Sequence, residues 1–310
     1  MTWHSPSGRR ALGLCLAGLA VFQWGTQPVL LALVVQSLEV AAAGWMRFAV
    51  TAALLLPLVL RRGGRELLRL RGRRLLLLTV CVAGPRCNYL TFMAALRYVS
   101  PGTAQVVIQL APMLMLLGGL VLFGEPFSRL QWLGIALLLG GLALFFSPRY
   151  GELAGELQGF GLGILLVIVS AVAWAVYLLS QKQLLTVLPP QAILLPIYAT
   201  GTILLFPAVR LAEFARLDPV HLGLLAATSI LTFTSYLSYA HAVEHIEASR
   251  IGVLLSLTPV VVFVMAGTFS LLLPDLARPE ELSLTSIGGA ALVVAGSMLG
   301  AMGSQSAPGG

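Results

Sequence analysis

Long apolar runs follow one another along almost the whole chain and constrain its fold more than any other feature. A helix needs about 20 apolar residues to cross the ~30 Å hydrocarbon layer of a bilayer. No alternating strand pattern competes with these runs, and a backbone in lipid must satisfy its own hydrogen bonds, as an α-helix does. The sequence therefore predicts an all-α membrane protein with ten transmembrane helices, near residues 10–35, 39–60, 74–97, 101–123, 129–147, 158–182, 190–210, 221–245, 249–273 and 285–303.

Charged residues are scarce and unevenly placed. They make up 10% of the chain, against about 25% in a soluble domain. The net charge of +7 arises mainly from arginines beside the apolar runs, which indicates contact with anionic lipid headgroups and no nucleic-acid partner. Cys15, Cys81 and Cys87 lie inside apolar runs without paired or metal-ligand spacing, so we predict no disulfide and no metal site.

The distribution of Lys and Arg predicts the orientation in the membrane. With a cytoplasmic N-terminus, the inner segments hold twelve of these residues and the outer loops hold five. Positive residues concentrate on the cytoplasmic side, so we predict that both termini lie there, in a multi-pass protein of the cytoplasmic (inner) membrane. The first apolar run continues to about Val35, which is longer than the roughly 7–15 residues of a signal-peptide core, so it is predicted to remain as the first helix. The inner set is Arg9, Arg10, Arg61, Arg62, Arg65, Arg69, Arg71, Arg73, Arg74, Arg129, Lys182 and Arg250, and the outer set is Arg97, Arg149, Arg210, Arg216 and Arg278.

The stretch from residue 94 to 128 contains a turn at Ser100-Pro101-Gly102 and a long apolar run broken by Pro112. Several residues in and before this stretch recur at a shift of 147 residues, which indicates an internal repeat. If each unit holds five crossings, the second must enter from the opposite face, so we predict two inverted five-helix repeats, which are typical of secondary transporters. The predicted parts are a tail (1–9), a first repeat (10–147), a linker (148–157), a second repeat (158–303) and a tail (304–310). The matched residues are Tyr89, Leu90, Ala95, Val106, Leu110 and Pro112 with Tyr236, Leu237, Ala242, Val253, Leu257 and Pro259.

Several segments together resemble the drug/metabolite transporter superfamily, in its ten-helix EamA-like family. They are Trp24-Gly25, Arg47-Phe48, Ala95-Leu96-Arg97-Tyr98, Pro112 and Gly124-Glu125. The resemblance implies a carrier of small metabolites, often an exporter of amino acids, that uses no ATP. The second half departs from the pattern, with Ala242-Val243-Glu244-His245 in place of the usual helix ending. No phosphate-binding GxxxxGK[ST] loop is present, and we predict no cofactor.

The prolines mark two interrupted helices. Pro112 removes the backbone donor for the carbonyl of Ile108, and Pro259 does the same for Leu255. Broken helices at matching places in inverted halves indicate a site near the midplane. We therefore predict a gating or cavity role for both, with helices three, four, eight and nine around the cavity. The alternative is a packed kink satisfied by neighbouring polar side chains.

Aromatic and amide side chains within the apolar runs are the predicted substrate-binding residues. They suit a weakly polar or aromatic small molecule, although amides also hold helices together, tryptophan anchors at the interface, and tyrosine packs in bundles. The set is Trp24, Gln27, Tyr89, Gln105, Gln109, Trp174, Tyr177, Tyr236 and Tyr239.

Arg86 is the charged candidate. It lies twelve residues beyond Arg74, about 18 Å along a helix, and a charge near the midplane needs water, a partner or a function. We predict that Arg86 faces a cavity and attracts a carboxylate, or else pairs with carbonyls freed beside Pro85. Arg47 is predicted to lie nearer the outer face, with a structural role.

His241, Glu244 and His245 form the pattern H-x-x-E-H, which also occurs in some zinc proteases. We favour a polar helix end, and a proton-responsive gate at His241, with proton coupling, stays open. Glu125 is predicted to pair with Arg129. No Ser/His/Asp triad is predicted, because such residues are dispersed over separate segments.

These features favour a secondary carrier, not an enzyme, that exports an amino acid or similar metabolite by alternating access. A non-transporting membrane receptor or assembly subunit is the alternative. The sequence does not indicate the oligomeric state.

Overall fold

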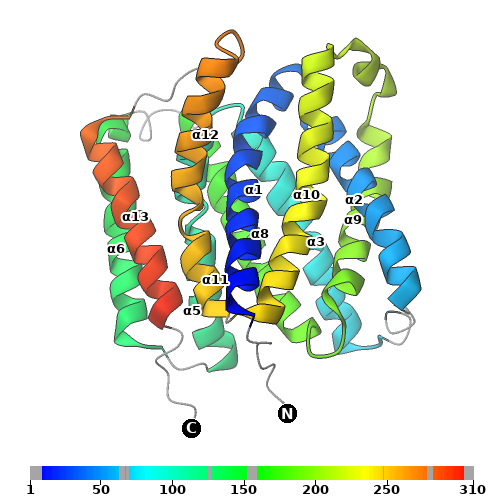
Figure 1. Ribbon diagram of the computed structural model, residues 1–310. Coiled ribbons are helices and arrows are strands. Elements are labelled where there is room, and N and C mark those ends of the chain that lie inside the picture. The colour runs from blue at the N-terminus through cyan, green and yellow to red at the C-terminus, as the bar shows by residue number, and fades with distance from the viewer. Residues whose placement is uncertain are drawn as a thin grey trace.

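The computed structural model describes residues 9–62, 67, 70–124, 127–151, 159–246, 248–277 and 282–303. Glu125, with which Arg129 was predicted to pair, most of the two tails and most of the linker lie outside the described residues. Within them the chain is helical, with no strand, and ten spans are long and apolar enough to cross a membrane. The predicted all-α fold with ten transmembrane helices is therefore confirmed (Figure 1).

Two of the spans are each made of two shorter helices. The helices are α1 (Arg10–Ser37), α2 (Val40–Arg62), α3 (Arg73–Ala95), α4 (Pro101–Val107) followed by α5 (Leu110–Phe123), α6 (Arg129–Phe146), α8 (Phe160–Leu184), α9 (Pro190–Leu205), α10 (Pro219–His245), α11 (Ala248–Leu255) followed by α12 (Thr258–Leu272), and α13 (Leu284–Gly303), with short 3-10 turns η2 (Ser147–Arg149), η3 (Phe206–Ala208) and η4 (Leu211–Arg216).

Local sequence signals fix several helix ends. Ser100 caps α4 by accepting a hydrogen bond from the Thr103 backbone N–H, with Pro101 in the first turn. Ser128 and Gln131 form a reciprocal capping box at the start of α6. Gly124 ends α5 with a positive φ of 64°, a conformation that glycine adopts without steric cost. Each device satisfies backbone groups that a helix end leaves open.

Four close helix pairs join the first half of the chain to the second. They are α1 with α10, α2 with α9, α3 with α8, and α6 with α13. Exchanging equivalent helices between the halves, α1 for α8, α2 for α9, α3 for α10 and α6 for α13, leaves this set of pairs unchanged. In Figure 1, α6 and α13 lie side by side at one edge, and α1 begins at the same end of the bundle at which α13 ends.

The α6–α13 pair approaches closely because both helices present glycine. A side chain at Gly141 would meet the backbone of Gly289 and Val293, and one at Gly289 would meet the backbone of Phe145. Small residues permit such backbone contact in membranes, where packing drives helix association.

Both predicted helix breaks are present. One interrupts the fourth span at Ile108 and Gln109, and the other interrupts the ninth at Ser256 and Leu257. Each break precedes its proline by about one turn, as the missing backbone donor requires. The Nε2 of Gln109 donates to the carbonyl of Ser256 at 3.0 Å, so the two breaks contact each other. These two residues are separated by the same 147 positions as the sequence repeat.

Candidate functional site

A buried arginine lies at the centre of the bundle. Arg47 of α2 is 0% exposed, and its Nε and Nη2 both donate to the hydroxyl of Thr232, at 3.1 and 2.9 Å. Its Nη1 lies 3.2 Å from the sulfur of Met93, and the guanidinium carbon is 5.2 Å from the ring centre of Tyr89. Thr232 is thirteen residues into α10, about 20 Å along that helix. Arg47 therefore reaches the interior of the bundle, deeper than the sequence analysis predicted.

Three tyrosines surround this arginine. The hydroxyl of Tyr89 donates to that of Tyr236 at 2.7 Å and lies 3.1 Å from that of Tyr198. Since a tyrosine has one hydroxyl proton, Tyr198 donates to Tyr89 in this arrangement. We call Arg47, Tyr89, Tyr198, Tyr236 and Thr232 the central cluster. Its members come from α2 and α3 in the first half, and from α9 and α10 in the second.

Aromatic side chains from α1 and α8 border the central cluster. The ring of Trp24 lies 5.6 Å from Tyr236 and 5.5 Å from Tyr239. The ring of Trp174 lies 6.3 Å from Tyr236 and 5.2 Å from Tyr177. The structure thus gathers six of the predicted substrate-binding residues around one point, including Tyr89, although this proximity does not by itself test their role.

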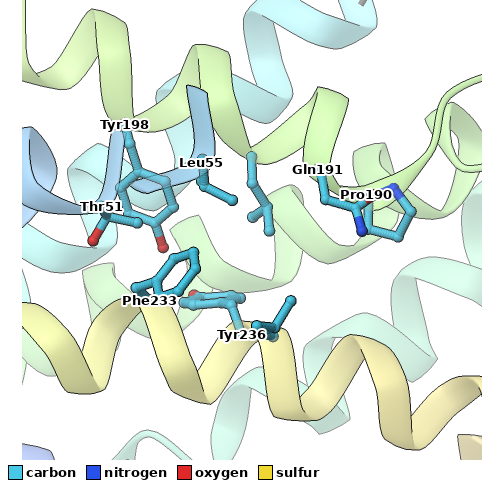
Figure 2. Close-up of a pocket in the computed structure, with 9 residues that line it drawn as sticks. Thr51, Leu55, Pro190, Gln191, Tyr198, Phe233 and Tyr236 are labelled. Carbon is cyan, nitrogen blue, oxygen red and sulfur yellow. The ribbon is translucent and has the colours of Figure 1, made fainter. Parts of the chain in front are cut away.

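A small cavity adjoins the cluster between α2, α9 and α10 (Figure 2). Its volume is about 10 Å³, roughly enough for one water molecule. Figure 2 shows Thr51 beside Tyr198 on one side and Phe233 and Tyr236 across from them. Thr51 is 1% exposed, and its hydroxyl has no hydrogen-bond partner among the described residues. The remaining lining residues are Leu55, Pro190, Gln191, Leu194 and Leu237.

The broken helices do not line this cavity. They contact each other through Gln109 and Ser256. The cavity is lined by α2, α9 and α10, although the two broken spans, α4 with α5 and α11 with α12, were among those predicted to surround it. The carbonyl of Ile108 accepts from the backbone N–H of Ala111, and that of Leu255 accepts from the hydroxyl of Thr258. The freed carbonyls are thus satisfied locally, that of Leu255 by a polar side chain, as in the packed-kink alternative, and that of Ile108 by a backbone group.

The other candidates lie around this centre. The amide of Gln27 donates to the Thr232 hydroxyl at 2.8 Å, beside Arg47. Arg86 is partly buried and donates to the hydroxyl of Thr200 at 3.3 Å, so its partner is a side chain of α9 and not a carbonyl beside Pro85. Residues Gln105, Pro112 and His241 are partly buried, and Pro259 is buried; their predicted roles stay predictions.

Sequence reasoning missed Tyr198, Thr51 and Thr232. Tyr198 has no matched partner in the 147-residue repeat, and threonine in an apolar run is common enough to attract no attention. Their shared signal is a polar atom in the interior of a span, which lipid does not satisfy.

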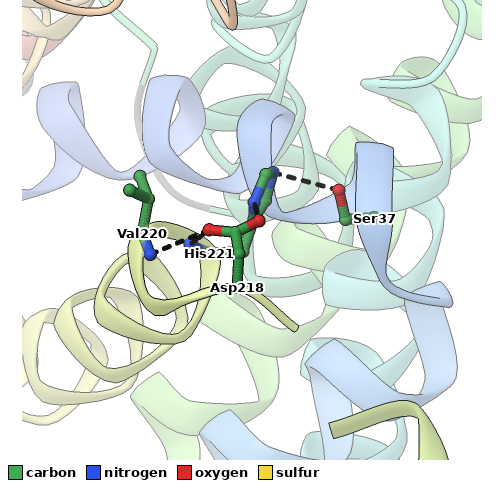
Figure 3. A network of polar contacts seen from close by, with 4 residues as sticks. All are labelled: Ser37, Asp218, Val220 and His221. Atoms are coloured by element: carbon green, nitrogen blue, oxygen red, sulfur yellow. Dashed lines mark hydrogen bonds and ion pairs between the residues drawn. The ribbon is translucent and has the colours of Figure 1, made fainter. Parts of the chain in front are cut away.

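A second polar network lies at the end of the bundle where α1 stops and α10 starts (Figure 3). The Nδ1 of His221 is 2.5 Å from Asp218, and its Nε2 is 3.0 Å from the Ser37 hydroxyl. The structure thus brings together a serine, a histidine and an aspartate from separate segments, so their dispersal along the sequence was not a sound reason to predict no such grouping. Asp218 also accepts from the backbone N–H groups of Val220 and His221, and these bonds hold its pKa below the ordinary value of 3.8. Asp218 is thus the cap of α10, and His221 links that cap to α1.

Comparison with known proteins agrees with this architecture. The EamA-like transporter family matches residues 11–147 and again residues 161–301. This chain belongs to the EamA-like transporter family. This EamA-like protein is therefore a membrane transporter, as its sequence resemblance predicted.

Its relatives carry similar descriptions. The chain is 31% identical over 299 residues to an "Uncharacterized transporter" of Haemophilus influenzae, covering 96% of this chain and 97% of that protein. It is 30% identical over 294 residues to the "Uncharacterized inner membrane transporter YhbE" of Escherichia coli K12, covering 94% and 92%. A solved crystal structure shares the fold, with a TM-score of 0.61 at 19% identity over 95% of this chain and 96% of that one.

Proposed function

We propose that this EamA-like transporter is a secondary carrier that exports amino acids or similar small metabolites by alternating access. The observation that carries the proposal is the central cluster, which is buried at the interface of the two halves and is built from both. A carrier that opens alternately to each side needs its site at such an interface. The adjoining cavity of about 10 Å³ is too small for a metabolite, so the halves must move apart to admit one.

The two halves are related by inversion in this proposal. The exchange of equivalent helices leaves the four close pairs between the halves unchanged. Tyr89 contacts Tyr236, and Gln109 contacts Ser256, at a separation of 147 residues in both cases. Residues on a two-fold axis contact their own equivalents, so both pairs support a pseudo-two-fold axis through the site.

The bundle is oriented with both termini in the cytoplasm of a multi-pass inner-membrane protein. The excess of Lys and Arg in the inner segments supports this orientation, and the name of the Escherichia coli relative supports the inner membrane. The cavity lies next to Pro190, at the start of α9, which is on the cytoplasmic side in this orientation. It is thus placed where a substrate for export would enter.

Counterflow with purified protein in liposomes tests the proposal. Liposomes loaded with amino acids, amines or nucleosides should accumulate the labelled compound only when protein is present and the matching substrate is inside. An imposed pH gradient will alter the rate if a proton is coupled. A receptor or assembly subunit would produce no flux.

A cross-link tests alternating access separately. Cysteines at Gln109→Cys and Ser256→Cys, in a variant without the native cysteines, would join the two breaks through a short reducible thiol reagent. We expect the cross-link to stop flux and a reductant to restore it. The Gln109→Cys variant alone, treated identically, is the control, and full flux through the cross-linked protein would contradict the mechanism.

A further inference from the structure

We propose that the substrate is a small organic anion whose carboxylate, or an equivalent acidic group, binds between Arg47 and Thr51. This inference rests on the proposed carrier function and specifies the charge of its substrate. It follows from the charges inside the membrane, the unused hydrogen-bonding capacity of Arg47, and the unpartnered hydroxyl of Thr51.

The membrane interior of this protein carries positive charge without compensation. None of the twelve acidic residues of the chain falls inside the ten described spans. Arg47 and Arg86 both lie well within their spans, and each contacts a threonine hydroxyl in place of a carboxylate. A cationic substrate would meet repulsion there and no counter-charge, whereas an anion would supply the charge that is missing.

The hydrogen bonds of Arg47 are incomplete for a buried guanidinium. Its five N–H groups have two acceptors among the described residues, the Thr232 hydroxyl and the Met93 thioether. A thioether is a weak acceptor. The Thr232 hydroxyl is shared by three donors, two from Arg47 and one from the amide of Gln27, and itself donates to the carbonyl of Thr228. Nε and Nη2, which here share the single oxygen of Thr232, form the edge of a guanidinium that can instead donate two parallel hydrogen bonds to the two oxygens of a carboxylate.

Thr51 supplies a second contact of the required kind. It follows Arg47 by four residues on α2, so the two side chains project from the same face, one turn apart. Its buried hydroxyl has no partner in the part of the chain that the structure describes, which costs free energy unless a ligand or water completes it. The hydroxyl belongs to the cavity wall together with Tyr198 and Tyr236. An anion held by Arg47 would extend into this cavity.

The surroundings fit an apolar or aromatic body behind the acidic group. Phe233 and Leu55 line the cavity, and Trp24 packs on Tyr236 at its border. The residues that line the cavity include aromatic rings, hydroxyls and the amide of Gln191 but no carboxylate that could neutralise the ammonium of a zwitterionic amino acid. The site therefore favours an anion without an ammonium group over an amino acid of the same shape.

Three compounds with the same ring test the charge preference. They are 3-phenylpropionate, which is an anion, phenylalanine, which adds an ammonium group, and phenethylamine, which keeps only the ammonium group. Binding to purified protein is measured by tryptophan fluorescence, transport of all three by counterflow of the labelled compound, and charge movement across proteoliposomes for the two compounds that carry a net charge. Passive entry of the neutral acid moves no charge, so a current reports the carrier alone. We expect binding and current with 3-phenylpropionate and much weaker responses to the other two.

Variants locate the acidic group. Arg47→Gln should weaken binding of 3-phenylpropionate by at least about 25-fold, because it removes one member of a buried charged pair. Thr51→Val should weaken it several-fold. Arg210→Gln, which removes one positive charge at an exposed position, should leave it unchanged. Loss of binding in Arg86→Gln but not in Arg47→Gln would overturn the assignment to Arg47.

The outcomes separate this inference from the carrier function. Flux of phenylalanine or phenethylamine without a response to 3-phenylpropionate would leave the carrier standing and overturn the anion. No binding and no flux of any of the three by folded protein would overturn the anion, and the carrier function would fall as well if the counterflow screen of amino acids, amines and nucleosides also gave no flux.

Discussion

Replacing Arg47 by methionine should abolish transport without unfolding the protein. On insertion scales a central arginine costs about 2.5–3.5 kcal/mol, and the substitution removes this cost. The substitution also loses the contact with the Tyr89 ring, about 0.5–2 kcal/mol, and charged hydrogen bonds of about 1.5–3 kcal/mol. The Thr232 hydroxyl keeps its own acceptor, the Thr228 carbonyl, at 2.7 Å. Methionine fills most of the vacated space and leaves no buried donor unpaired.

The two sets of terms nearly offset each other, so the free energy of unfolding should change by no more than about 1–2 kcal/mol. That corresponds to a shift of only a few degrees, roughly 2–4 °C per kcal/mol, in the unfolding temperature. The assay is thermal unfolding of purified protein in detergent, together with liposome flux. A purely structural arginine would behave differently, because its loss would destabilise the bundle.

The adjacent residue provides a matched control. Phe48 is equally buried, and its ring packs on Tyr89 and Tyr198 at 5.4 and 5.6 Å. Truncation of a buried phenylalanine to alanine costs about 3–5 kcal/mol, so Phe48→Ala should unfold at a clearly lower temperature. If Arg47→Met is destabilised as much as Phe48→Ala, Arg47 holds the bundle together. If Arg47→Met still transports, the site lies elsewhere.

Two further predictions concern the scaffold. Gly289→Ala should destabilise the protein by about 2 kcal/mol or more, because the added carbon would lie 2.3 Å from the backbone nitrogen of Phe145. Gly140→Ala, where nothing lies within 4 Å, should unfold at the wild-type temperature, and equal effects would refute the close α6–α13 packing. Asp218 has a lowered pKa in the folded protein, so its stabilising effect is complete above the ordinary value of 3.8 and is lost as the pH falls through the folded pKa. The difference in unfolding temperature between wild type and Asp218→Ala should therefore stay constant from pH 7 to about pH 5 and shrink below about pH 4, and a difference that persists in strong acid would contradict this role.

Features that depend on local sequence were predictable. The ten spans follow from the length of each apolar run, and the helix breaks follow from Pro112 and Pro259, since a missing backbone donor acts one turn away. The start of α4 follows from Ser100 and Pro101, because serine is favoured as an N-cap and proline in the first turn of a helix. None of these inferences requires knowledge of which helices are neighbours.

The central cluster was only partly predictable because it depends on helix neighbours. Arg47 was placed by its position along its own helix, yet its side chain bonds to Thr232, 185 residues away. Arg86 was favoured by the same reasoning, and its partner Thr200 is 114 residues away. The link between Ser37 and His221 likewise spans 184 residues. The position of a residue along its own helix predicts its depth in the membrane, but it does not predict which neighbouring helix its side chain contacts.

The charge of the proposed substrate also bears on the direction of transport. Moving one charge across a membrane changes its free energy by about 2.3 kcal/mol per 100 mV, which is about a 50-fold ratio of concentrations at equilibrium. Because the cell interior is negative, an anion gains this free energy when it leaves, whereas a zwitterion gains none. The spans hold no acidic residue that could relay a proton, and an exporter of anions needs none. An inside-negative potential should therefore drive 3-phenylpropionate out of proteoliposomes, and an inside-positive potential should drive it in. Equal accumulation at both potentials would show that the transported species carries no net charge. That result would contradict both the anionic substrate and the predicted direction of transport.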